Sequence, residues 1–143
     1  MATAHDVAEY ILKSCGSMSA MKLQKLVYYS QAWHLVWDDE PLFHESVEAW
    51  ANGPVIRELY ECHRGKFSVG AWPAGNAEVL TEEERGSVDA IIKHYGDKTA
   101  FWLSEATHRE DPWRDVRAGL GPNDRSNNEI TTAAMAEYYS SLV

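Results

Sequence analysis

Residues 21–65 read MKLQKLVYYSQAWHLVWDDEPLFHESVEAWANGPVIRELYECHRG, and this stretch decides the fold of the chain. In its first part, apolar residues recur at steps of three and four, which predicts a long amphipathic helix from about residue 20 to residue 37. The apolar face of that helix comprises Leu23, Leu26, Val27, Ser30, Trp33 and Trp37. The acidic residues 38–40 oppose the negative end of the helix dipole, and Pro41 prevents the helix from continuing. We therefore expect a central helix that ends close to Trp37.

The remainder of this stretch predicts a short extended segment followed by a second helix. Apolar and polar residues roughly alternate from Leu42 to Ala51, a pattern that permits a short strand pair or hairpin. Gly53 can adopt unusual backbone angles, and Pro54 suits the first turn of a helix. We therefore expect a helix from Val55 to His63.

The sequence outside this stretch adds further helices. Asp6 suits the N-terminal end of a helix over residues 6–13. Thr81 and Glu84 form a capping-box pattern, which opens a helix that ends at Tyr95. The remaining predicted helices begin near Asp97, near Pro112, and at Thr131 or Thr132.

Together these elements predict a mainly α fold. We expect a compact single-domain helical bundle of about six helices over residues 1–143, with at most a short strand pair near residues 42–51. The sequence lacks the strand–helix alternation of nucleotide-binding folds, and it contains neither GxGxxG nor GxxxxGK[ST]. The usual nucleotide-binding architectures are therefore not expected.

Charge and cysteine content narrow the choice of partner and compartment. The chain has 13 Lys and Arg against 22 Asp and Glu, a net charge of −9 at pH 7, which disfavours nucleic acid as a partner. Cys15 and Cys62 are isolated, as reduced intracellular thiols are. No apolar run approaches the ~18 residues that span a bilayer, so we expect a cytoplasmic protein with no membrane partner.

An ordered set of motifs within and beyond the opening stretch resembles one known family. The motifs are Leu23-Gln24-Lys25-Leu26-Val27-Tyr28-Tyr29 with Trp33, Pro41-Leu42-Phe43, Val47-Glu48-Ala49-Trp50, Gly53-Pro54-Val55 and Leu59-Tyr60, followed by Tyr95-Gly96, Leu103-Ser104 before His108, Pro112-Trp113 and Ile130. In this order and at these separations they resemble the Panacea domain, also called the phage-associated GepA-like or SocA-like antitoxin domain. The resemblance covers nearly the whole chain.

The resemblance implies a small, mostly helical antitoxin of the kind found in prophages and other mobile elements. Such a protein neutralises a toxin encoded by an adjacent gene through direct protein–protein binding, either by covering the toxin's site or by delivering the toxin to a cellular protease. The toxins belong to several unrelated classes, so the resemblance does not name the partner. It carries over no active site, and it implies mainly a fold role for Gly53-Pro54-Val55.

The residues themselves give little sign of catalysis. Cys62 and His63 are adjacent, and adjacent helical residues point about 100° apart, so the two side chains cannot readily hydrogen-bond to each other. The six histidines show no HExxH spacing, and the cysteines form no CxxC. His108 lies near Glu110 and Asp111, but a polar helix end explains this cluster as well as acid–base chemistry does. We therefore expect no enzyme activity, no cofactor and no metal site.

The aromatic residues suit either a core or the hot spots of a protein interface. We expect most of the six tryptophans and seven tyrosines to lie in the core. Trp72 is the expected exception, because it lies beside Pro73 in a glycine-containing loop, and Phe67 of the same loop is its companion. Trp72 and Phe67 are therefore the predicted partner-binding residues.

The sequence leaves three functional hypotheses open. The first is the antitoxin. The second is a small hydrolase or metal-dependent enzyme whose site forms only in the fold, from His108, His44 or Cys62; convergence of two of these side chains in a pocket would favour it. The third is a DNA-binding regulator that uses the helix at 20–37 or 54–63, which the net charge disfavours unless the fold gathers a basic face.

Overall fold

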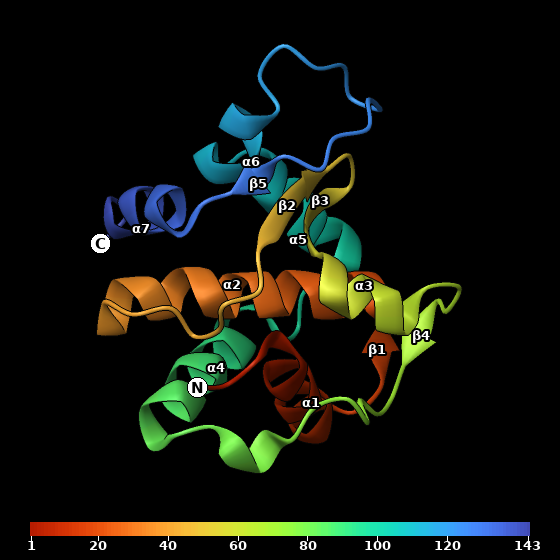
Figure 1. Cartoon of the computed structure of the whole chain (residues 1–143), viewed down its shortest axis with the longest axis vertical. Coiled ribbons are helices and arrows are strands. Elements are labelled where there is room, and N and C mark those ends of the chain that lie inside the picture. Colours follow the sequence, from red (N-terminus) through yellow and green to blue (C-terminus); the bar gives the residue numbers. More distant parts are fainter.

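The long helix expected near residues 20–37 is the centre of the computed structural model, which describes all of residues 1–143 (Figure 1). This helix, α2, runs from Ala20 to Asp38. The Ser19 side chain caps it by accepting a hydrogen bond from the Lys22 N–H at 3.1 Å. At the other end Asp39 adopts a left-handed conformation with φ 61°, which stops the helix. The predicted helix and its C-terminal end are confirmed.

Six further α-helices and one short 3₁₀ helix surround α2. They are α1 (Ala4–Cys15), α3 (Arg57–His63), η1 (Ala77–Val79), α4 (Glu82–Tyr95), α5 (Ala100–His108), α6 (Asp111–Val116) and α7 (Thr132–Ser140). Figure 1 shows α1 and α4 on one side of α2, with a small sheet, α5, α6 and α7 on the other. The fold is mainly α as predicted, with seven α-helices instead of about six. No helix combines the length and the hydrophobicity that crossing a bilayer requires.

The predicted apolar face of α2 is buried from Leu23 to Ser30, but it is not the only buried face of this helix. Because the helix is covered from two sides, polar residues such as Gln24, Lys25 and Gln31 are also buried. Trp37, expected on the apolar face, is instead exposed near the end of the helix. A central helix has no solvent face, so its periodicity does not show which polar side chains point into the protein.

The buried polar side chains of α2 are satisfied by extended backbone beside the helix. The Gln24 side chain accepts from the Ile56 N–H at 2.9 Å and donates to the Ile56 carbonyl at 3.1 Å. Gln31 accepts from the Leu42 N–H at 2.7 Å and donates to the Phe43 carbonyl at 2.8 Å. Each amide pairs with backbone N–H and C=O groups in the way that a neighbouring strand does. The central helix therefore fixes the chain before β2 and at the end of β3.

The strands form two small antiparallel sheets. In the larger sheet, β2 (Val47–Trp50) lies between β3 (Gly53–Ile56) and β5 (Glu129–Ile130), in the order β3-β2-β5. The smaller sheet pairs β1 (Met18–Ser19) with β4 (Ser68–Val69). The predicted limit of one strand pair is therefore wrong, because five strands form two sheets. The pair expected near residues 42–51 is the hairpin at residues 47–56.

The position of Gly53 and Pro54 explains why the hairpin extends beyond residue 51. They belong to β3, and α3 begins only at Arg57 instead of at Val55. Residues 51 and 52 form a two-residue turn, so Trp50 pairs with Gly53 directly. The pairing of Gln24 with Ile56 then keeps the chain extended for the length of β3.

Helix caps show where local sequence signals were sufficient. The capping box of Thr81 and Glu84 is present, and Thr131 caps α7. Asp6 forms a capping box with Thr3, so α1 begins earlier than expected. The helix expected to begin near Asp97 is α5, which begins at Ala100, and the side chain of Thr99 caps it.

A buried network of tyrosines and one carboxylate joins α2 to the C-terminal helices. Glu110 Oε1 accepts hydrogen bonds from the hydroxyls of Tyr29 and Tyr139, each at 2.8 Å. The Tyr139 hydroxyl also lies 3.1 Å from that of Tyr28. Burial raises the pKa of Glu110, and the two hydroxyl donors only partly oppose this. The network ties the start of α6 and the C-terminal end of α7 to the same turn of α2.

Candidate binding pocket

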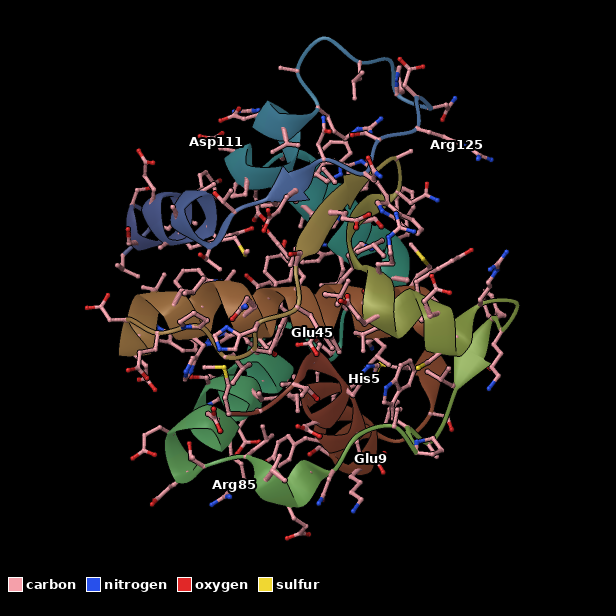
Figure 2. The ribbon with its side chains drawn as sticks, in the orientation of Figure 1. His5, Glu9, Glu45, Arg85, Asp111 and Arg125 are labelled. Atoms are coloured by element: carbon pink, nitrogen blue, oxygen red, sulfur yellow. The ribbon has the colours of Figure 1, made fainter.

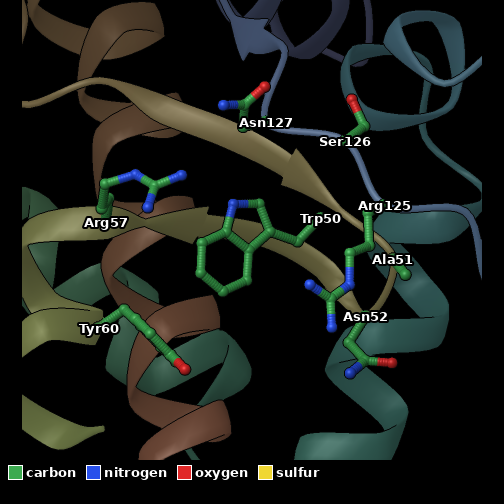
Figure 3. A pocket seen from close by; sticks show the side chains of 8 residues that line it. All are labelled: Trp50, Ala51, Asn52, Arg57, Tyr60, Arg125, Ser126 and Asn127. Atoms are coloured by element: carbon green, nitrogen blue, oxygen red, sulfur yellow. The ribbon is translucent and has the colours of Figure 1, made fainter.

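A pocket opens at the end of the β2–β3 hairpin, where the hairpin turn, α3 and the loop before β5 meet (Figure 3). Its volume is about 560 Å³, within the range of roughly 300–1,000 Å³ that is usual for ligand pockets. Eight residues line it: Trp50, Ala51, Asn52, Arg57, Tyr60, Arg125, Ser126 and Asn127. We call this site the Trp50 pocket, after the ring that lies between its two arginines in Figure 3.

Three neighbours hold the Trp50 ring in place. Its indole N–H donates to Glu48 Oε1 at 2.9 Å. The Tyr60 ring meets it edge-on, with the ring centroids 4.9 Å apart, and the Arg57 guanidinium lies 5.5 Å from its centroid. Trp50 is half-buried, so part of a fixed aromatic surface faces the pocket.

Arg57 is oriented by a two-point ion pair with Glu48. Its Nε and Nη2 atoms donate to Glu48 Oε2 and Oε1 at 3.1 and 2.9 Å. Burial by itself would raise the pKa of Glu48, but hydrogen bonds from Arg57 and Trp50 outweigh it and hold that pKa below its ordinary value. Glu48 is therefore ionised at neutral pH and offsets one of the two arginine charges.

A buried arginine, Arg117, fastens the loop that forms the far wall of the pocket. Its guanidinium donates to the carbonyl of Ala49 at 3.1 Å, and to those of Gly121 and Asp124 at 3.1 and 2.7 Å. The same group lies over the Trp113 ring, 5.3 Å from its centroid. One side chain thus connects β2 to the loop that carries residues 125–127.

Helices α5 and α6 hold the end of the hairpin through two hydrogen bonds. The Trp113 indole N–H donates to the Trp50 carbonyl at 2.7 Å, and the Ser104 hydroxyl donates to the Asn52 carbonyl at 2.9 Å. His108 stacks on Trp113 with ring centroids 4.0 Å apart. The backbone carbonyls of Trp50 and Asn52 are therefore fixed by α5 and α6.

The charge of the Trp50 pocket differs from that of the chain. Its lining contains two arginines and no acidic residue, although the whole chain has a net charge of −9. Arg57 is paired with Glu48, whereas Arg125 lies within 4 Å of no carboxylate. Figure 2 shows Arg125 at the outer edge of the molecule. The pocket can therefore accept an anionic group next to an aromatic surface.

The two predicted partner-binding residues lie in opposite environments. Trp72 is only 3% exposed, so the expectation that it would be poorly buried is wrong. Its indole N–H donates to His5 Nδ1 at 3.0 Å and its backbone N–H to Glu9 at 3.1 Å, both on α1 (Figure 2). Phe67, in contrast, is 85% exposed. Partner binding through either residue stays a prediction.

Most of the tryptophans and tyrosines lie in the core or pack against it, but few of the tryptophans are fully buried. Trp72 is the one tryptophan that is fully buried, whereas Trp33, Trp50 and Trp113 are half-buried and Trp37 and Trp102 are exposed. Most of these rings are thus packed against the core from its edge. Half-buried tryptophans with one fixed face are typical of protein-binding surfaces.

The candidate catalytic residues lie in different parts of the fold. His108 is on α5 against Trp113, Cys62 is exposed on α3, and His44 is exposed in the loop before β2. No hydrogen bond joins any two of them, and no three His, Cys, Asp or Glu side chains are grouped so as to hold a metal ion. Burial lowers the pKa of His108, whose Nε2 atom is buried without a partner.

Sequence reasoning missed the residues of the Trp50 pocket. The alternation in β2 did contain a signal, since Glu48 and Trp50 share the face opposite Val47 and Ala49. Nothing in the sequence indicates Arg125, which reaches the pocket only because Arg117 holds its loop against β2. The hydrogen bonds of Arg117 thus join β2 to a loop that is far from it in the sequence.

One comparison with known proteins found a match, which covers part of the pocket. A family model described as antitoxin SocA-like, Panacea domain, matches residues 23–114. These residues include Trp50, Arg57 and Tyr60, while Arg125 lies outside them. No curated protein and no solved structure matches the chain significantly.

Proposed function

Because this chain belongs to the family of SocA-like antitoxins with a Panacea domain, we propose that it neutralises a cognate toxin protein by binding to it directly. The family match over residues 23–114 is the observation that carries this proposal. The partner is the product of a neighbouring gene, as expected for a toxin and antitoxin that are made together. Binding then replaces chemistry as the activity of this chain.

The structure offers a surface that suits such binding. Tryptophan, tyrosine and arginine are the residues most enriched in the hot spots of protein interfaces, and the Trp50 pocket contains all three. Trp50 is fixed before any partner arrives, so little conformational entropy is lost on binding. We place this encounter in the cytoplasm, which suits two unpaired and exposed cysteines, Cys15 and Cys62.

Co-expression with the product of the neighbouring gene tests the proposal. That product alone should arrest growth, and co-expression of this chain should restore growth and yield a complex on size-exclusion chromatography. A neighbouring product that is harmless alone, or that stays toxic beside a well-expressed copy of this chain, would contradict the antitoxin function.

The amount of toxin distinguishes two ways of neutralisation. If the antitoxin covers the toxin's site, the toxin level stays constant while its activity is lost. If it delivers the toxin to a cellular protease, the toxin level falls on co-expression and recovers in a host that lacks the protease. Immunoblotting against a tagged toxin, with growth measured in parallel, separates these outcomes.

A further inference from the structure

Starting from the antitoxin function proposed above, we propose that the Trp50 pocket is the docking site for an acidic segment of the toxin. Carboxylates of that segment pair with Arg125 and with the free edge of Arg57, and the aliphatic part of the segment lies on Trp50. This assigns a surface and the chemistry of its ligand, which membership of the family alone does not supply.

Charge is the first argument for an acidic ligand. The surface of a chain with a net charge of −9 generally repels acidic segments, whereas the pocket lining has two arginines and no carboxylate. An acidic segment is therefore favoured at this place over most of the remaining surface. The pocket thus sets both the position and the orientation of the partner.

The hydrogen-bonding capacity of the arginines is the second argument. Glu48 uses Nε and Nη2 of Arg57, which leaves the Nη1 edge for a ligand. Arg125 has no carboxylate within 4 Å, and its guanidinium matches a carboxylate at two points. In Figure 3 the two guanidinium groups lie on opposite sides of the Trp50 ring, a layout that suits two acidic side chains on one segment.

The acidic neighbours of Arg57 favour carboxylates over phosphate. Arg57 is paired with Glu48, and Glu61 and Glu58 also act on its charge, so Arg125 is the one arginine of the lining without a carboxylate partner. One unpaired arginine matches a carboxylate, which carries one negative charge, better than a phosphate group, which carries about two. Moreover, Glu48 occupies the indole N–H of Trp50, so the ring offers an apolar surface to the stem of a side chain.

A charge reversal in the full-length chain tests this inference against the toxin. The variant Arg125→Glu should weaken binding to the product of the neighbouring gene at least tenfold in isothermal titration calorimetry. The matched control is Lys93→Glu, the same charge change on an exposed residue of α4, which lies on the other side of α2 from the hairpin (Figure 1). The control should bind within twofold of wild type. Circular dichroism and thermal melting check that both variants are folded.

A second set of measurements uses small probes and needs no toxin. A capped tetraglutamate peptide should shift the indole resonance of Trp50 in the wild-type protein but not in Arg125→Glu, and a capped tetraglutamine peptide should shift it in neither. Inorganic phosphate and adenosine monophosphate are the competing ligands. If either of them shifts the resonance at a lower concentration than tetraglutamate does, the site is one for phosphate and the proposed acidic segment is wrong.

The outcomes separate this inference from the antitoxin function. If wild type neutralises the toxin and Arg125→Glu does so equally well with unchanged affinity, the docking site is wrong and the antitoxin function stands. If wild type fails to neutralise the toxin, the antitoxin function is wrong, and the peptide titration still decides whether the pocket takes carboxylates. Restoration of binding to Arg125→Glu by one acidic-to-lysine change in the toxin would identify the paired residue.

Discussion

Lys25 fills the space that a side chain on residue 53 would need. A Cβ atom built on Gly53 would lie 2.6 Å from Lys25 Cε, and the Lys25 ammonium donates to the neighbouring Pro54 carbonyl at 3.2 Å. Gly53 also has φ +125°, a conformation that L side chains rarely adopt. The central-helix motif that contains Lys25 therefore packs directly against the hairpin motif that contains Gly53 and Pro54.

Replacing Gly53 should destabilise the protein. Gly53→Ala adds backbone strain and a contact with Lys25, and we expect a loss of about 2–3 kcal/mol in the free energy of unfolding, measured by urea denaturation. Gly86→Ala is the control, because that position is exposed within α4 and open to a Cβ. It should raise stability by roughly 0.5–1 kcal/mol. Equal effects of the two substitutions would contradict the close fit of Lys25 and Gly53.

Lys25 should make stability depend on pH in a defined window. Burial lowers its pKa from 10.5 to about 7, so between these values the unfolded chain binds a proton that the folded protein does not. The free energy of unfolding should therefore rise from pH 7 to pH 9, by at most about 1.4 kcal/mol per pH unit. Urea titrations across this range give the slope. Lys25→Met should flatten it, and an unchanged slope in that variant would assign the effect to another group.

The hydroxyl of Tyr139 should contribute to stability, whereas that of its neighbour should not. Tyr139→Phe removes the hydrogen bond to Glu110 and the contact with Tyr28, so we expect a loss of about 1–2 kcal/mol. Tyr138→Phe is the control, because Tyr138 is only half-buried and its hydroxyl makes no hydrogen bond. Thermal denaturation of the two variants should show a lower midpoint for Tyr139→Phe alone.

Arg117 should act on toxin binding through the loop that it holds. Arg117→Met removes hydrogen bonds to Ala49, Gly121 and Asp124, so amide hydrogen exchange over residues 121–128 should become faster. Affinity for the toxin should fall as well, although Arg117 is buried and cannot touch the partner. Exchange in β1 and β4 is the internal control and should not change. Faster exchange with unchanged affinity would mean that the position of the loop is unimportant for binding.

Phe67 and Trp72 should differ in what their substitution affects. Phe67→Ser should leave the melting temperature within the error of measurement, because the ring is 85% exposed, and should weaken toxin binding if Phe67 is part of the interface. Trp72→Ala should cost about 3–5 kcal/mol of stability, because it empties a buried site. Calorimetry of toxin binding tests whether each residue belongs to the interface, and melting curves test whether it supports the core. Unimpaired binding by Phe67→Ser would remove that residue from the predicted interface.

Local signals in the sequence predicted the helices, because a helix is closed by residues a few positions apart. The capping box at Thr81 appears where the sequence places it, and Thr131, one of the two threonines that the sequence offers, caps α7. The strands were harder to predict. β5 has two residues and exists only because it pairs with β2 some 80 positions earlier in the chain.

The Trp50 pocket was hidden from the sequence for the same reason. Arg57 and Arg125 are brought to one site by the hairpin and by the bonds of Arg117, and neither has a local motif. Trp72 was misjudged because its glycine-rich surroundings indicate a loop but not where the loop packs. Its partners, His5 and Glu9, belong to the first helix.

Because α7 packs on the central helix, the protein can complete its fold only after its last helix has been synthesised. Tyr28 leaves the ribosome more than a hundred residues before Tyr139, its hydrogen-bonded neighbour. Until α7 emerges, Tyr28 and Trp33 lack the cover of Tyr139, and exposed apolar surface of this kind attracts chaperones and proteases. A chain interrupted before residue 132 would keep this surface exposed, so we expect it to be more susceptible to proteases than the full-length chain.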